Sequence, residues 1–265
     1  IALLTASPAL ALQASDNAGN APYANGWDAG DNGGTGFGPW VFPPDFNDVP
    51  SMDPIYGGDP TFIDGVGLGP LAANTLGAPA FGISVGSLPY FFNTVEAHRT
   101  FSAPLTVGNT FSVDIDGSAL TPAAPFDGKG NVFALMGSDA VERFGMFTFL
   151  GSNANNWIAT GGNTPVPAAD SFHLAFTLTG VDSYSMELTP VGGGAPLYSE
   201  SGSLGGTAGV GISSIRISNF GTGSSADGRT ELFVDNLSVV PEPSTLAMML
   251  LFGLGLVATN RRGAR

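Results

Sequence analysis

The 265-residue chain contains no cysteine, so it can form neither a disulfide framework nor a thiolate metal site or nucleophile. Charged residues are scarce at 11%, and 8 basic residues stand against 22 acidic ones, which gives a formal net charge of −14. A surface with this excess of negative charge repels phosphate backbones. The composition therefore argues against nucleic-acid binding. A net negative charge of this size is also explained simply by solubility outside a cell.

Motifs for common catalytic chemistry are also missing. The sequence contains no His-Glu-x-x-His, no Gly-x-Ser-x-Gly and no phosphate-binding loop. Its two histidines are His98 and His173. His173 lies between apolar neighbours, and we expect it to be a surface or hydrogen-bonded strand residue. The sequence thus offers few candidates for catalysis.

Helical patterns are scarce before the C-terminus, because 39 glycines and 20 prolines disfavour long helices. Alternation of apolar and polar residues instead predicts half-buried strands, separated by turn signals such as Gly192–Gly194. The clearest windows are 111–116, 171–178, 183–188, 212–218 and 230–240. Many short strands at this spacing predict an all-β fold, an antiparallel β-sandwich formed by residues 15–240 as one domain.

The last 25 residues have a different pattern. Pro241-Glu242-Pro243 precedes an uncharged apolar run, Leu246–Ala258, and the chain ends in an arginine-rich segment, residues 261–265. At about 1.5 Å per residue, a helix over residues 244–260 would be roughly 25 Å long, at the short end for crossing a bilayer. The arginines favour a cytoplasmic C-terminus. We therefore predict a single C-terminal transmembrane helix.

This order of motif, apolar span and arginines closely resembles the PEP-CTERM sorting tail of Gram-negative bacteria. The resemblance implies that residues 241–265 are recognised at Pro241, Glu242 and Pro243 by the membrane protease-transpeptidase exosortase. It also implies an exported protein that is anchored transiently in the membrane and then reaches the cell surface or the extracellular matrix.

The N-terminus agrees with export. Residues 1–14 are apolar and rich in small residues, like the end of a signal peptide with its cleavage region. They lack an initiating methionine and a basic segment, so we expect a signal peptide truncated at its start. Cleavage after Ala11 and cleavage after Ala14 are both compatible with the sequence.

The closing strand suggests a more specific sandwich. Phe233–Val239 reads Phe-Val-Asp-Asn-Leu-Ser-Val and resembles the last strand of jelly-roll carbohydrate-binding and concanavalin-like domains. The resemblance implies a jelly-roll-like body and a structural calcium ion near the termini, with Asp235 as the ligand carried over. Asp28 and Asp31 offer further oxygens for a hard cation, although ordinary turn chemistry explains them equally well.

Three large aromatics lie in the Gly/Asn-rich segment before the first predicted strand: Tyr23, Trp27 and Trp40. They could stack on sugar rings. Alternatively, they plug the open end of the sandwich, which we favour because aromatic side chains of this size usually bury area.

Asp114 and Asp116 lie two residues apart on one predicted strand and therefore on one face. Two carboxylates are the minimum for glycoside hydrolysis, but the third acid expected in jelly-roll glycosidases is missing. We therefore predict a non-catalytic surface or matrix protein that binds extracellular polysaccharide. The alternative is a glycan-processing enzyme, a hydrolase or lyase, on the same scaffold.

Overall fold

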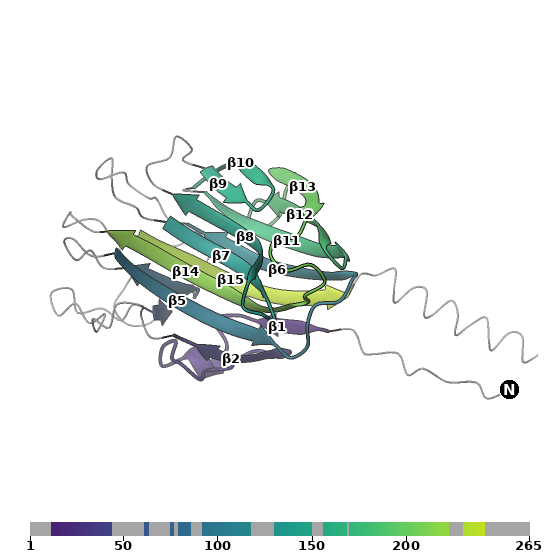
Figure 1. Ribbon diagram of the computed structural model, residues 1–265. Coiled ribbons are helices and arrows are strands. Elements are labelled where there is room, and N and C mark those ends of the chain that lie inside the picture. Colours follow the sequence, from purple (N-terminus) through teal and green to yellow (C-terminus); the bar gives the residue numbers. More distant parts are fainter. Residues whose placement is uncertain are drawn as a thin grey trace, which may run out of the picture.

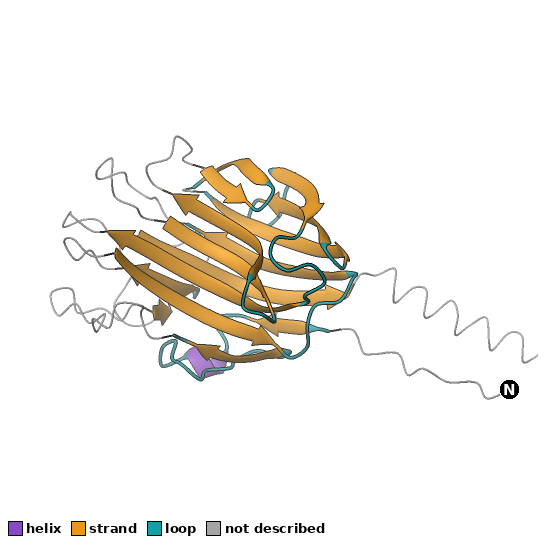
Figure 2. Cartoon of the chain, viewed as in Figure 1, coloured by secondary structure: helices purple, strands orange, loops and turns teal. Residues whose placement is uncertain are grey.

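The computed structural model describes residues 12–43, 61–63, 75–76, 79–85, 92–117, 130–149, 156–168, 170–222 and 230–241. Within them, two antiparallel β-sheets pack face to face (Figure 1). The only helix among them is a single 3₁₀ turn, η1 (Ala21–Tyr23), which lies beside the sandwich (Figure 2).

The first sheet has eight strands. Its spatial order is β13 (Tyr198–Ser203), β12 (Ser183–Thr189), β11 (Ser171–Gly180), β6 (Asn109–Asp116), β15 (Thr230–Pro241), β4 (Phe81–Val85) and β3 (Thr61–Ile63). The eighth strand, β1 (Ala14–Asp16), pairs with the C-terminal part of β15.

The second sheet has seven strands. Its spatial order is β10 (Gly162–Pro167), β9 (Asn156–Ala159), β8 (Glu142–Phe149), β7 (Gly130–Gly137), β14 (Ile212–Thr222), β5 (Phe92–Phe101) and β2 (Phe37–Val41). Every strand pairing in both sheets is antiparallel.

The core lies between the two sheets and follows the alternation in the sequence. In β11, Phe172, Leu174 and Phe176 are fully buried, while the residues between them are half-buried on the other face. Burial of one such side chain stabilises the fold by roughly 1.5–3 kcal/mol. Because alternate side chains of a strand lie on opposite faces, these residues together place one face of β11 in the core. We call the opposite side of the eight-stranded sheet, turned away from the seven-stranded sheet, its outer face.

The all-β antiparallel prediction is confirmed, and each of the five predicted strand windows lies in an observed strand. The closing strand, β15, is an interior strand of its sheet, between β6 and β4. No helix in the described part of the chain has the length and apolar character needed to span a bilayer. The predicted transmembrane helix lies beyond Pro241, outside the described residues.

The sandwich also uses residues that precede the predicted start of the body. Leu12 and Ala14 are buried in the core, and Ala14 pairs with Val239. The alternation of apolar and polar residues does not predict β1, because a three-residue strand is too short to show it. Residues 1–11 lie outside the described residues.

Candidate functional site

The three aromatics predicted as possible sugar platforms are buried. Tyr23 and Trp40 have no exposed surface, and Trp27 is 2% exposed. Their rings pack edge-on or tilted against one another and against Phe81, with centroid distances of 4.8–5.4 Å. The structure therefore gives them the plugging role, because a ring needs an open face to stack on a sugar.

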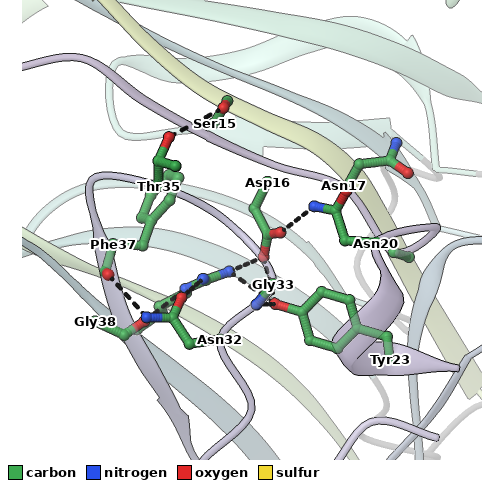
Figure 3. Close-up of polar contacts among 12 residues, drawn as sticks. Ser15, Asp16, Asn17, Asn20, Tyr23, Asn32, Gly33, Thr35, Phe37 and Gly38 are labelled. Atoms are coloured by element: carbon green, nitrogen blue, oxygen red, sulfur yellow. Dashed lines mark hydrogen bonds and ion pairs between the residues drawn. The ribbon is translucent and has the colours of Figure 1, made fainter. Parts of the chain in front are cut away.

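The aromatic plug borders a polar group that we call the interior cluster. It consists of the buried Asp16, Tyr23 and Arg99 and of Asn32, which is exposed. Arg99 forms an ion pair with Asp16 in which both side chains are fully buried. The guanidinium also donates to Asn32 Oδ1 at 2.6 Å and to the carbonyl of Gly38 at 2.9 Å. Figure 3 shows how the Asn/Gly-rich segment folds around Asp16 to make these contacts.

Every charge in the interior cluster is compensated. Tyr23 donates its hydroxyl proton to Asp16 at 2.5 Å and accepts the N–H of Gly33 at 2.9 Å. Burial raises the pKa of Tyr23 to about 12, and the hydrogen bond to Asp16 acts in the same direction. The guanidinium of Arg99 lies 4.7 Å from the centroid of the Phe37 ring, in a cation–π contact. Asp16, Tyr23 and Arg99 are buried and offer no surface for a ligand, while Asn32 is exposed; the role of the cluster is to bind the N-terminal segment to the second sheet.

Asp28 and Asp31 form an ordinary turn. The N–H of Asp28 donates to Asp31 Oδ2 at 2.9 Å, and the Asn25 amide lies 3.5 Å from Asp28 Oδ2. Both oxygens of Asp235 accept hydrogen bonds from protein groups. In the described ranges, no three His, Asp or Glu residues are grouped so that they could hold a metal ion. Calcium binding by Asp28, Asp31 and Asp235 stays a prediction, tested by a rise in Tm in millimolar calcium relative to a chelator.

A second polar group lies on the outer face of the eight-stranded sheet. His173, Asp114 and Asp235 are register partners on the neighbouring strands β11, β6 and β15. His173 Nδ1 lies 2.6 Å from Asp114 Oδ1, and the Asn236 amide donates to Asp114 Oδ2 at 2.8 Å. The Asn17 amide donates to Asp235 Oδ2 at 2.8 Å. We call these five residues the outer-face cluster.

A bulge in β15 allows the outer-face cluster to form. The register of β15 against β6 shifts between Asp235 and Ser238, and Asn236 has a φ of 53°. Such a bulge places two successive residues on one face. Asn236 can therefore reach Asp114 while Asp235 remains opposite it. Asparagine tolerates this left-handed conformation better than most residues do.

Asp235 lies in the most confined part of the cluster. Its Oδ1 accepts the N–H of Ala18 at 2.8 Å. Burial raises the pKa of its carboxyl to about 6, against the lowering effect of backbone N–H donors, and the charges of Asp114 and Asp16 raise it further. The charged form of Asp235 is therefore unfavourable in the folded protein.

Asp114 and Asp116 do not act as a pair. Asp116 is 2% exposed, and its Oδ2 accepts hydrogen bonds from both the backbone N–H and the hydroxyl of Thr75, at 2.7 and 2.9 Å. Asp114 is tied instead to His173 and Asn236. Although both carboxylates lie on one face, as predicted, separate partners hold them.

The outer face carries a row of register-paired residues, four of them serines, next to the cluster. Register pairs connect Ser199, Glu187, Ala175, Ser112, Ser238 and Ser15 on six successive strands. We call these residues the serine row. At about 4.8 Å between strands, five spacings make the row roughly 24 Å long. Ser112 and Ser238 are hydrogen-bonded at 2.7 Å, as are Thr110 and Thr177 beside them at 2.8 Å.

Two hollows open along the serine row. One, of about 430 Å³, lies at the outer-face cluster and is lined by His173 together with Ser15, Asp16, Asn17, Asn20, Ser112, Asn236, Leu237 and Ser238. The other, of about 600 Å³, is lined mainly by Ala175, Thr177, Ser185, Glu187, Ser199 and Ser201. Hydroxyl groups thus line both hollows, with carboxamides at the smaller one and carboxylates at the larger one.

The charge of the outer face is negative. The three arginines in the described residues lie elsewhere: Arg99 is in the core, and Arg143 and Arg216 are on strands of the other sheet. His173, whose side chain is 36% exposed, is the basic group of the described part of this face. The sequence could not reveal the cluster or the row, because both depend on the pairing of strands far apart in the chain.

A family model for the PEP-CTERM protein-sorting motif matches residues 239–265. The predicted sorting tail is therefore confirmed. The matched segment begins inside β15, whose last residue is Pro241, while Glu242 and Pro243 lie outside the described residues. No curated protein matches the chain significantly.

Solved structures resemble the fold only distantly. A glycoside hydrolase family protein from Mycobacterium thermorestibile is 15% identical, with a TM-score of 0.44 and coverage of 76% of this chain and 92% of that one. An endo-β-1,4-glucuronan lyase from the fungus Trichoderma reesei is 10% identical, with a TM-score of 0.42 and coverages of 62% and 82%. An alginate lyase from Klebsiella pneumoniae is 7% identical, with a TM-score of 0.41 and coverages of 63% and 83%. This similarity is too low to transfer a ligand or a reaction.

Proposed function

We propose that this protein is exported by a Gram-negative bacterium and sorted through its tail to the cell surface or extracellular matrix. The matched sorting motif at residues 239–265 supports export and sorting. Exosortase recognises Pro241-Glu242-Pro243, and the apolar run Leu246–Ala258 anchors the chain until the tail is removed. Mass spectrometry should then find a mature surface form that lacks residues 261–265, and retention of those residues would contradict the processing.

The sandwich itself binds extracellular polysaccharide without processing it. The observation that carries this proposal is the serine row, which crosses six strands, presents serine hydroxyl groups on four of them and has two hollows beside it. Hydroxyl groups both donate and accept hydrogen bonds, so such a row matches the hydroxyl groups of a sugar chain. A length of roughly 24 Å suits an extended polymer better than a single small molecule.

The charge of the outer face restricts the class of polysaccharide. Asp114, Asp235 and Glu187 lie on it, and the described part of the face has no arginine or lysine. Facing like charges cost free energy and slow association, so a polyuronate would be repelled. The face therefore prefers neutral or amino-bearing polysaccharides.

A binding assay with three polymers tests this proposal. The full-length protein should bind a neutral glucan or chitosan and should bind alginate at least tenfold more weakly at low salt. Added salt should narrow the difference, because it screens exposed charges. If none of the three polymers, nor any glycan on a broad array, binds the protein, the polysaccharide-binding function is wrong.

One observation favours the alternative, a glycan-processing enzyme. Asp114 Oδ1 lies 2.6 Å from Nδ1 of the half-exposed His173, which lines the adjoining hollow. A carboxylate–histidine pair of this kind can transfer a proton to or from a bound ligand. Incubation of each bound polymer with wild-type protein and with His173→Gln separates the two functions. Our proposal expects no new reducing ends or unsaturated products from either form. Products from the wild type alone would establish the enzyme.

A further inference from the structure

The first described strand, β1, is held on both of its edges. On one side Ala14 pairs with Val239 and Asp16 with Leu237 in β15. On the other side, Ser15 and Thr35 exchange two backbone hydrogen bonds, at 3.0 and 2.9 Å. Figure 1 shows β1 beside the closing strand, so the first and last described strands of the chain are neighbours.

The side chains of this segment belong to the core. Leu12 is 8% exposed, Ala14 is 2% exposed, and the carboxylate of Asp16 is buried against Arg99. Gln13, between them, points outward and is exposed. Residues 12–16 are therefore a structural part of the sandwich.

The following loop is shaped around the backbone of the same residues. A Cβ on Gly34 would lie 2.4 Å from the carbonyl oxygen of Ser15, and a Cβ on Gly36 would lie 2.3 Å from that of Gln13. Gly36 also has a φ of +72°, which other residues rarely adopt. Only glycine permits this close approach, so the loop depends on the backbone of residues 13–15 being present.

The two cleavage positions allowed by the sequence therefore have different consequences. A cut after Ala14 would remove Leu12 and Ala14 from the core and would place a new charged ammonium on Ser15, whose N–H donates to Thr35. A cut after Ala11 would leave β1 whole. Small residues at the first and third positions before the cut also favour Ala9-Leu10-Ala11 over Leu12-Gln13-Ala14.

We propose that the signal peptidase cleaves the bond between Ala11 and Leu12, so that Leu12 is the first residue of the mature protein. The proposal rests on export, which is part of the proposed function, but it does not depend on polysaccharide binding. It also implies an order of events. β1 can pair with β15 only after β15 has been translocated, because β15 lies more than 200 residues later in the chain.

N-terminal sequencing or intact mass spectrometry of the protein exported from a Gram-negative host tests the cleavage site. We expect the sequence to begin Leu-Gln-Ala-Ser. An exported form that begins at Ser15 or that retains residues before Leu12 would overturn the cleavage site while leaving the proposed function intact. A protein that is not exported at all would overturn both.

A matched pair of variants sharpens the test. Ala11→Gln places a large residue directly before the bond and should cause uncleaved precursor to accumulate at least severalfold. Gln13→Glu changes an exposed side chain of similar size two residues after the bond and should be processed as the wild type is. Normal processing of Ala11→Gln at the same bond would contradict the proposal.

Discussion

The sandwich contains two polar groups built from similar residues, and they differ mainly in what covers them. The interior cluster joins Asp16 and Arg99 across the two sheets with both side chains fully buried. The outer-face cluster joins Asp114 and His173 across neighbouring strands, with the imidazole 36% exposed. Asparagine amides donate hydrogen bonds to the single carboxylate of the interior cluster and to both carboxylates of the outer-face cluster.

This difference shows why a polar cluster alone does not indicate a binding site. The groups of the interior cluster are satisfied by one another, and its surroundings are the rings of Phe37 and Trp40. The outer-face cluster also has satisfied carboxylates, but it borders an open hollow of about 430 Å³ and the serine row. Solvent access and the neighbouring serine hydroxyl groups, rather than charge, make the outer face the candidate for binding.

The largest expected effect is on the interior cluster. Arg99→Met would leave Asp16 buried without its partner, and breaking a buried pair in this way costs about 3–5 kcal/mol. Urea denaturation followed by tryptophan fluorescence measures this loss. Arg216→Met is the matched control, because its pair with Glu142 is 25% and 38% exposed and should contribute at most about 1 kcal/mol. Equal losses in the two variants would contradict the structural role of the interior cluster.

A smaller effect is expected from the pH dependence of Asp235. Its pKa in the folded protein is about 6, above its ordinary value of about 3.8, so the folded state binds the proton more tightly than the unfolded state does. This contribution to stability is therefore present below about pH 4 and is lost as the pH rises through about 6, with a total of about 3 kcal/mol.

The variant Asp235→Asn isolates this contribution. The difference in unfolding free energy between wild type and variant should shift in favour of the variant as the pH rises from about 4 to about 7. Asp28→Asn, at an exposed turn carboxylate, is the control and should track the wild type. A constant difference between wild type and Asp235→Asn across this range would show that burial does not raise the pKa of Asp235.

The smallest effect on stability is expected at His173. Its half-exposed ring has one described hydrogen bond, to Asp114. His173→Gln keeps a side chain able to donate to that carboxylate, so most of a hydrogen bond to a charged group, which contributes roughly 1.5–3 kcal/mol, is retained. Chemical denaturation should show a loss of about 1 kcal/mol or less. A loss as large as that of Arg99→Met would remove the contrast between the two clusters.

The strands and the tail could be predicted from the sequence because their signals are local. The alternation in Ser171–Leu178 and the order of motif, apolar run and arginines need only neighbouring residues. The partners of Asp16 and Asp114 could not be predicted, since Arg99 and His173 are 83 and 59 residues away in the sequence. The aromatic plug could be anticipated from side-chain size. β1 was too short to predict, and the serine row appears only when the register of six strands is known.

The most direct test of polysaccharide binding compares one substitution on each of the two sheets. Ala175→Lys places a long side chain in the serine row at the hollow of about 600 Å³, and Ser214→Lys places the same side chain on the half-buried outer position of β14 in the other sheet. We predict that Ala175→Lys weakens binding of the neutral polymer at least tenfold at unchanged Tm, while Ser214→Lys binds as the wild type does. Unchanged binding by Ala175→Lys, or equal weakening by both variants, would contradict binding at the serine row.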